Sequence, residues 1–121
     1  MSVESRSHER RRSVRLRVNR PGSYTRFDEE GRPIEQRPVR SLNISAEGVG
    51  LESRYPVDPG EILRFTMALR DNSIRFRGKV IYVNRTEGEG IRFGVSIRDM
   101  SKTDRIALIR FIYYFDSPKT A

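Results

Sequence analysis

The chain has 121 residues and a mass of 14.1 kDa, which fits one ordinary domain built around a single core. It contains no cysteine and one histidine, so a disulfide framework, a metal site and catalysis by thiol or imidazole are not expected. The net charge is +8, and residues 1–20 carry seven arginines against Glu4 and Glu9, which predicts an anionic partner near this end.

The cellular location of the chain is predicted from two features that its sequence lacks. No apolar run approaches the roughly 20 residues of a membrane-spanning helix. The amino terminus is polar and rich in arginine, without the apolar core of a signal peptide. We therefore expect no membrane span and a cytoplasmic location.

The chain divides into two short tails and one domain. Residues 1–9 are polar and lack periodicity, which predicts a flexible tail. Residues 10–116 form the expected domain, and residues 117–121 a carboxy-terminal tail. Within the first half of the domain, short segments with alternating apolar residues are separated by turn residues. These segments are residues 14–18, 23–27, 39–45 and 49–52.

The second half of the domain carries the clearest strand pattern. Every second residue from Leu63 to Leu69 is apolar, which is the period of a strand with one buried face. The same period runs from Ile74 to Tyr82 and from Ile91 to Ile97. Short strands at close spacing, without helices between them, predict an antiparallel barrel or sandwich.

The last element is predicted to be a helix that closes one end of this fold. Ser101 and Asp104 match a capping box, apolar residues then recur at helical spacing, and Pro118 forbids continuation. Residues Phe111 to Phe115 read FIYYF and cannot all face one core, because successive helical side chains point about 100° apart. Either Tyr114 lies on the surface with its hydroxyl in water, or this face docks a partner.

Enzyme signatures are missing from the sequence. No glycine-rich loop of the P-loop or dinucleotide type is present, and Gly88-Glu89-Gly90 is more simply a hairpin turn. None of the 16 acidic residues stands at a spacing that indicates a catalytic pair. We therefore expect a protein that is not an enzyme and has no cofactor.

Arginines near the start of the domain form the first candidate binding motif. Arg11 and Arg15 are four residues apart, and Arg10 directly precedes them. In an extended chain an even spacing places both side chains on one face, so the two guanidinium groups can converge on one ligand. Each group can bind a phosphate with two hydrogen bonds or donate to the O6 and N7 atoms of guanine.

The sequence NISAEG forms the second candidate motif. Asn43 and Ser45 are two residues apart at a predicted strand end, with the apolar Ile44 facing the core. Gly48 is expected to allow a turn with positive φ. An amide and a hydroxyl side by side can read the polar edge of a base, although such sequences also serve purely structural turns.

Together, in this order, the two motifs resemble those of the PilZ domain family. The RxxxR motif of that family is matched by Arg11 and Arg15, and its [D/N]xSxxG motif by Asn43, Ser45 and Gly48. The resemblance extends from Glu9 to about Phe115. It implies an all-β fold with one helix, a six-stranded antiparallel β-barrel followed by a carboxy-terminal α-helix.

The resemblance also implies a ligand, since many PilZ domains are bacterial receptors for the second messenger cyclic di-GMP. It implies that Arg11 and Arg15 contact the phosphates and guanine edges. Asn43 and Ser45 would contact a guanine, and Gly48 would shape the turn.

Two further residues are assigned through this resemblance. Arg10 stands where the family sets whether one ligand or an intercalated pair is bound, and an arginine there resembles the pair-binding type. Tyr82 aligns loosely with an aromatic that lies near the nucleotide in some relatives. The alternative for Tyr82 is a core position on the face that begins at Ile74.

Signalling would pass through a protein partner. Binding is expected to order the arginine segment against the barrel, a change that an effector protein could sense. The resting state is expected to be a monomer or a ligand-dependent dimer. Two alternatives remain from the sequence: a basic barrel that binds nucleic acid without sequence preference, and a PilZ module used only for partner binding.

Overall fold

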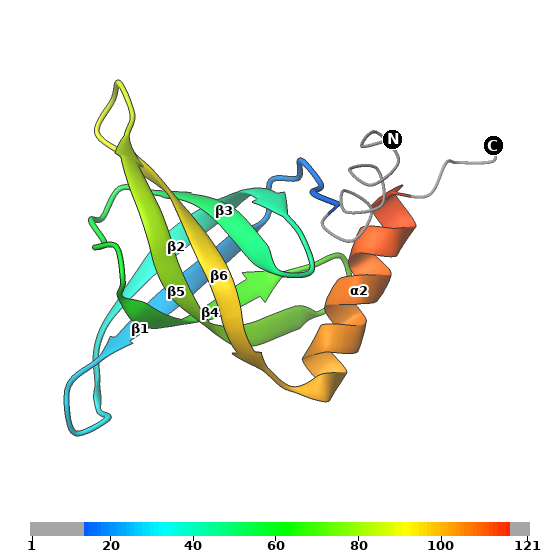
Figure 1. Ribbon diagram of the computed structural model, residues 1–121, viewed down its shortest axis with the longest axis horizontal. Helices are drawn as coiled ribbons and strands as arrows, with labels where there is room; N and C mark the ends of the chain where they lie inside the picture. The colour runs from blue at the N-terminus through cyan, green and yellow to red at the C-terminus, as the bar shows by residue number, and fades with distance from the viewer. Residues whose placement is uncertain (1–13, 117–121) are drawn as a thin grey trace, which may run out of the picture.

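The computed structural model describes residues 14–116, with side chains described as far as residue 114. In this range six antiparallel strands close into a barrel in the order β1-β2-β3-β6-β5-β4, and one helix follows (Figure 1). The bounds are β1 (Pro21–Phe27), β2 (Pro33–Ile44), β3 (Gly48–Ser53), β4 (Ile62–Ala68), β5 (Ser73–Arg85), β6 (Ile91–Met100) and α2 (Lys102–Asp116). The six-stranded barrel with a carboxy-terminal helix is therefore confirmed.

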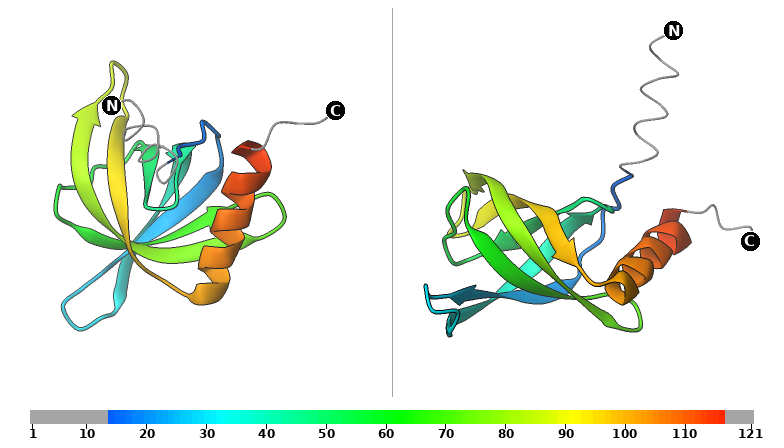
Figure 2. Two further views of the ribbon diagram at one scale, coloured as in Figure 1. Left: turned by 45° about the vertical axis from the view of Figure 1, so that its right-hand side comes forward. Right: turned by 60° about the horizontal axis from the view of Figure 1, so that its bottom comes forward.

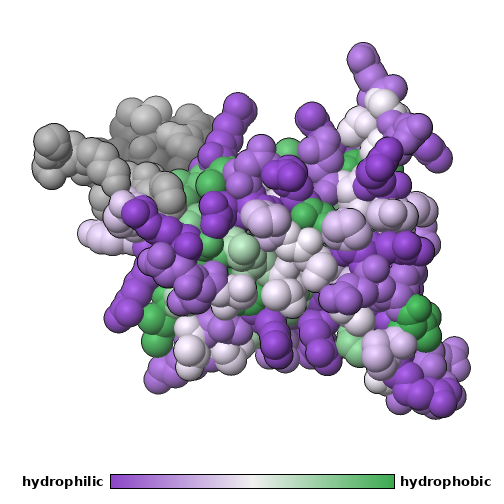
Figure 3. All heavy atoms as spheres, turned by 180° about the vertical axis from the view of Figure 1, so that it is seen from behind, coloured by the Kyte–Doolittle hydropathy of each residue, from purple (hydrophilic) through white to green (hydrophobic). Residues whose placement is uncertain are grey.

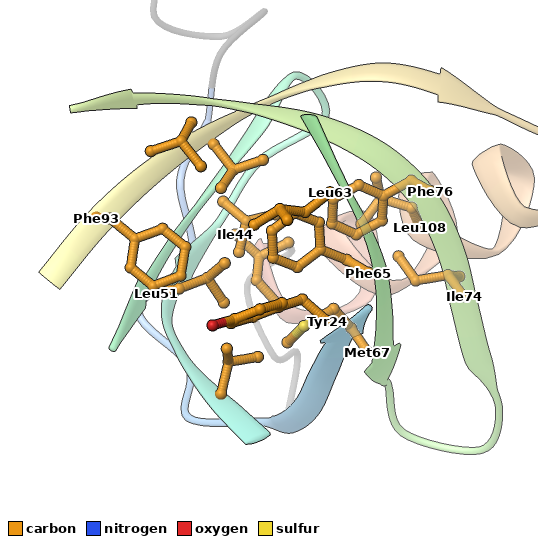
Figure 4. Close-up of a cluster of buried hydrophobic side chains, with 14 of the residues drawn as sticks. Tyr24, Ile44, Leu51, Leu63, Phe65, Met67, Ile74, Phe76, Phe93 and Leu108 are labelled. Carbon is orange, nitrogen blue, oxygen red and sulfur yellow. The ribbon is translucent and has the colours of Figure 1, made fainter. Parts of the chain in front are cut away.

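The interior of the barrel is filled by the apolar residues of the alternating pattern. Tyr24, Phe65 and Phe93 have no exposed surface, and the rings of Phe65 and Phe76 stack with centroids 5.2 Å apart. Figure 4 shows these side chains converging from several strands on one core. Burying each such side chain stabilises the fold by about 1.5–3 kcal/mol, so the apolar residues of the alternating pattern hold the barrel together.

Residues 14–18 do not form the strand that their alternation suggests. The structure gives them one isolated bridge, in which Leu16 and Ile44 exchange backbone hydrogen bonds of 2.8 and 2.9 Å. The pairing of β1 explains why only one bridge forms. On one side β1 pairs with β2 only as far as Arg40, and on its other side it pairs with β4. Leu16 therefore covers the end of β2 that β1 leaves unpaired.

The helix α2 packs across one end of the barrel (Figure 2). The hydroxyl of Ser101 accepts a hydrogen bond of 3.1 Å from the backbone of Asp104, as the capping motif predicts. The carboxylate of Asp104 instead accepts from the backbone of Arg75, which ties the helix to β5. Leu108 is fully buried against the barrel, whereas Ile106 on the opposite side is 43% exposed.

The FIYYF segment is divided between core and surface, as its helical geometry requires. Phe111 and Ile112 are buried, whereas Tyr113 and Tyr114 are exposed. The guanidinium of Arg70 lies 4.6 Å from the centre of the Tyr114 ring. A cation at this distance from a ring is favourable, so the ring of Tyr114 contacts the β4–β5 turn as well as solvent.

An ion cluster at the other end of the barrel joins three segments of the chain. Arg26 of β1 donates hydrogen bonds to Glu35 of β2 and to both carboxylate oxygens of Glu61, next to β4. These hydrogen bonds from Arg26 hold the pKa of the Glu61 carboxyl below its usual value. The cluster therefore stabilises the fold while Glu61 is ionised.

Across residues 14–116, no helix is long and apolar enough to cross a membrane. The view from behind shows mainly polar side chains, with hydrophobic ones in separate areas among them (Figure 3).

Candidate functional site

The structure brings together one residue from each predicted motif. The Nη1 of Arg15 donates a hydrogen bond to the Oδ1 of Asn43, 28 positions away in the sequence. The neighbouring bridge between Leu16 and Ile44 holds the two backbones side by side. Arg10 and Arg11 lie outside the described residues, so their convergence on the same ligand stays a prediction.

The turn that follows β2 is held closed by Ser45. This side chain is only 2% exposed, and its hydroxyl accepts hydrogen bonds from the backbone N–H groups of Glu47 and Gly48. The same hydroxyl donates to the carbonyl of Gly48 at 3.0 Å. Ser45 therefore shapes the turn beside Asn43, and its predicted contact with a ligand remains a prediction.

Gly48 is needed for a different reason from the one expected. Among the described residues only Gly31 and Gly60 have positive φ, so the prediction of positive φ at Gly48 was wrong. Gly48 begins β3 opposite β6, where an added Cβ would lie 2.7 Å from the carbonyl oxygen of Val95. The close approach of β6 to the turn, rather than a left-handed backbone, requires the glycine.

Two further glycines form an outward-facing row with residues already singled out, and the sequence reasoning missed both. Asn43 of β2 pairs with Gly50 of β3, Gly50 with Gly94 of β6, and Gly94 with Tyr82 of β5. We call these four residues the glycine row. It faces outward at Gly50, because both neighbours of Gly50 in β3 are buried in the core.

The two glycines let larger side chains lie flat on the sheet. A Cβ on Gly50 would lie 2.7 Å from the Nδ2 of Asn43, and one on Gly94 would lie 2.2 Å from the Cε2 of Tyr82. The amide of Asn43 and the ring of Tyr82 thus cover backbone that only glycine leaves bare. The glycine row is therefore a flat surface with an amide at one end and an aromatic ring at the other.

Tyr82 is not a core residue, so the alternative assignment to the core was wrong. A bulge between Val80 and Tyr82 moves the alternation by one position, and the side chain is 48% exposed. The glycine opposite, Gly94, was the available signal, since a glycine inside a strand often marks a close approach.

The charges beside the glycine row are mainly positive. On one side of the glycine row, Lys79 and Gly48 pair with Ser96. On the other side lies Arg92, whose Nε is 3.9 Å from the Oε2 of Glu52. The described residues contain no group of three acidic or histidine side chains that could hold a metal ion. A forked cation, an amide and an aromatic ring on one surface are suited to an anion that carries flat bases.

Comparison with known proteins identifies the family of this arrangement. The family model of the PilZ domain matches residues 9–114. No curated protein matches the sequence significantly. Several solved structures share the fold. Their sequence identities to this chain are low, so the similarity establishes the fold alone.

Three of these structures illustrate the similarity. The inhibitor of motility MotI/DgrA of Bacillus subtilis is 21% identical, with a TM-score of 0.74 over 93% of this chain and 54% of that one. YcgR of Escherichia coli in complex with c-di-GMP is 16% identical, with a TM-score of 0.68 over 88% of this chain and 46% of that one. The PilZ domain of YcgR from Escherichia coli with c-di-GMP is 16% identical, with a TM-score of 0.64 over 87% of this chain and 90% of that one. The chain thus spans about half the length of the first two proteins.

Proposed function

Because this chain belongs to the PilZ domain family, we propose that it is a non-enzymatic receptor for cyclic di-GMP. The observation that carries the proposal is the contact between Arg15 and Asn43, which joins the two family motifs on one surface. Two YcgR structures of the same fold contain c-di-GMP. A ligand with two phosphates and two guanines needs forked donors and flat surfaces, and this surface has both.

Each residue has a distinct role in the proposed complex. Arg11 and Arg15 bind the phosphates and guanine edges of the ligand, and Arg15 also keeps the amide of Asn43 in place. Asn43 reads the polar edge of one guanine. The exposed face of the Tyr82 ring stacks on a base, a contact worth roughly 1–3 kcal/mol.

The [D/N]xSxxG turn supports these contacts from below. Ser45 fixes the turn by three hydrogen bonds to its backbone, and its proposed second role is to contact the guanine that Asn43 reads. Gly48 lets β6 approach closely. Arg10 sets whether one ligand or an intercalated pair binds, and a pair is the expected stoichiometry.

The protein is proposed to act as a cytoplasmic adaptor. Binding orders the segment around Arg11 against the barrel, and an effector protein senses that state. A ligand pair shared between two chains would give a dimer, so the adaptor is a monomer that dimerises only with ligand. Light scattering with and without cyclic di-GMP measures this directly.

A second candidate function, non-specific binding of nucleic acid, is favoured by one feature. Arg64 of β4 and Arg77 of β5 stand directly opposite each other on the outside of the barrel. Like charges at paired positions repel each other and attract an anion. Asp99 lies 3.5 Å from Arg77 and offsets part of this charge.

One titration separates the two candidates. The protein is titrated with cyclic di-GMP, GTP and single-stranded DNA at two salt concentrations. The receptor function predicts saturable binding of cyclic di-GMP only. Binding of DNA that falls steeply with salt, without preference for cyclic di-GMP, would establish the nucleic-acid function instead.

A further inference from the structure

A groove of about 740 Å³ lies between α2 and the turn that joins β4 to β5. The turn provides one wall, with Leu69 and Arg70, and the helix provides the other, with Ile106, Arg110 and Phe111. A hollow of this size is comparable to pockets that accept small ligands, so it can take several side chains of a docked segment. It is separate from the glycine row, which lies on β2, β3, β6 and β5.

The lining of the groove is apolar below and positively charged at the rim. Leu69 and Phe111 are buried in its floor, whereas Ile106 is 43% exposed at its side. Arg70 and Arg110 supply two cations to the lining, against one carboxylate, that of Asp71. An apolar floor with a net positive rim complements an acidic segment with apolar residues on one face.

The helix continues this surface beyond the groove. Ile109 follows Ile106 by three positions and is 44% exposed. Residues three apart on a helix lie on the same side. The two isoleucines therefore extend the exposed apolar area by about one turn along α2.

One wall of the groove is connected to the turn of the proposed ligand site. The Nη1 of Arg105 on α2 donates a hydrogen bond of 3.3 Å to the carbonyl oxygen of Ala46. Ala46 lies within the NISAEG turn, next to Ser45. A shift of this turn on ligand binding would thus act on the helix through Arg105.

The other wall is connected to the segment that carries the arginine motif. The side chain of Arg20 donates hydrogen bonds to the carbonyl oxygens of Ala68 and Leu69, at the start of the β4–β5 turn. The backbone of Arg20 also exchanges hydrogen bonds with Ser41 of β2. Arg20 and Arg105 therefore link the two walls of the groove to segments that adjoin the proposed ligand site.

We propose that this groove docks an acidic, amphipathic segment of an effector protein, and that ligand binding changes its affinity through Arg20 and Arg105. The docking follows from the chemistry of the groove alone. Its dependence on cyclic di-GMP rests on the proposed function.

Docking is tested by selecting peptides from a displayed random library on the full chain and measuring the enriched peptides by fluorescence anisotropy. We expect enriched sequences to combine Asp or Glu with regularly spaced apolar residues. Ile106→Asp and Arg110→Glu should each weaken binding at least tenfold. Their matched controls, Ile34→Asp and Arg85→Glu, place the same changes at exposed positions on β2 and β5 and should stay within twofold.

The opposite results overturn the docking proposal. A library that yields no acidic peptides would do so, as would peptides whose binding survives both groove variants. Equal losses in the control variants would show that the peptides bind by charge or apolar contact anywhere on the surface.

Coupling is tested with the same peptides in the presence of cyclic di-GMP. We expect the ligand to change peptide affinity at least threefold in the parent chain and by a smaller factor in Arg105→Ala, which keeps only the connection through Arg20, while both bind the ligand equally in calorimetry. Ligand binding without an effect on the peptide overturns the coupling alone. Absence of ligand binding overturns the proposed function and the coupling with it, but leaves the docking result in place.

Discussion

Replacing Gly94 by alanine tests whether the glycine row is part of the ligand site. The added Cβ would lie 2.2, 2.7 and 2.9 Å from three ring atoms of Tyr82, whereas carbon atoms in contact prefer about 3.5–4.0 Å. The ring must therefore move by about an ångström or more from its place on the sheet. Losing a stacking contact of about 1–3 kcal/mol weakens binding about 5- to 150-fold.

The assay is calorimetry with cyclic di-GMP on Gly94→Ala, Tyr82→Ala and the double variant. If glycine acts by placing the ring, the double variant should bind no more weakly than Tyr82→Ala, because the two changes remove the same contact. Gly88→Ala is the control, since a Cβ there meets nothing within 4 Å. Full affinity in Gly94→Ala, or losses that add in the double variant, would show that Gly94 does not act by placing the Tyr82 ring.

Three further results are expected. Gly48→Ala should lower the free energy of unfolding by about 1–3 kcal/mol, because its Cβ would meet the carbonyl of Val95 at 2.7 Å; an unchanged urea midpoint would contradict this. Glu61→Gln should flatten the acid dependence of stability. Arg26 lowers the pKa of Glu61 in the folded state, so its contribution is present above the unfolded pKa of about 4.3 and lost as pH falls through the folded value. Melts at pH 7 and pH 3 should therefore differ less for the variant than for the parent. Arg15→Lys should weaken cyclic di-GMP about tenfold in calorimetry, since lysine keeps the charge and loses the fork; equal affinity would show that only charge matters.

The strands of the second half were predictable because their pattern reports burial directly. Every second residue from Leu63 to Leu69 is apolar, and all four apolar side chains are buried. The pattern fails at Tyr82, where a bulge adds one residue to β5. Nothing local in the sequence marks that bulge, because it depends on the pairing with β6.

Pairing between distant strands also limited the prediction of the segment before β1. Residues 14–18 alternate like a strand, but only Leu16 finds a partner, at Ile44. Alternation shows that a segment can pair. It does not show how much unpaired edge the rest of the fold leaves for it.

The site was predictable where the residues lie close in sequence. The NISAEG turn was identified with its family motif, and the structure adds that the hydroxyl of Ser45 bonds within the turn. Gly50 and Gly94 were missed because the meaning of a glycine depends on the side chain across from it. Only the pairing of four strands shows that Asn43 and Tyr82 lie on these two glycines.

Arg11 and Arg15 with the NISAEG turn form the proposed receptor site for cyclic di-GMP. Calorimetric titration of the parent chain, Arg11→Ala and Arg15→Ala is the decisive measurement for this site, with thermal melts to verify folding. Each arginine contributes charge-assisted hydrogen bonds worth about 1.5–3 kcal/mol apiece, so we expect saturable binding by the parent chain and none detectable in either folded variant. Parent-level affinity in either variant would contradict it.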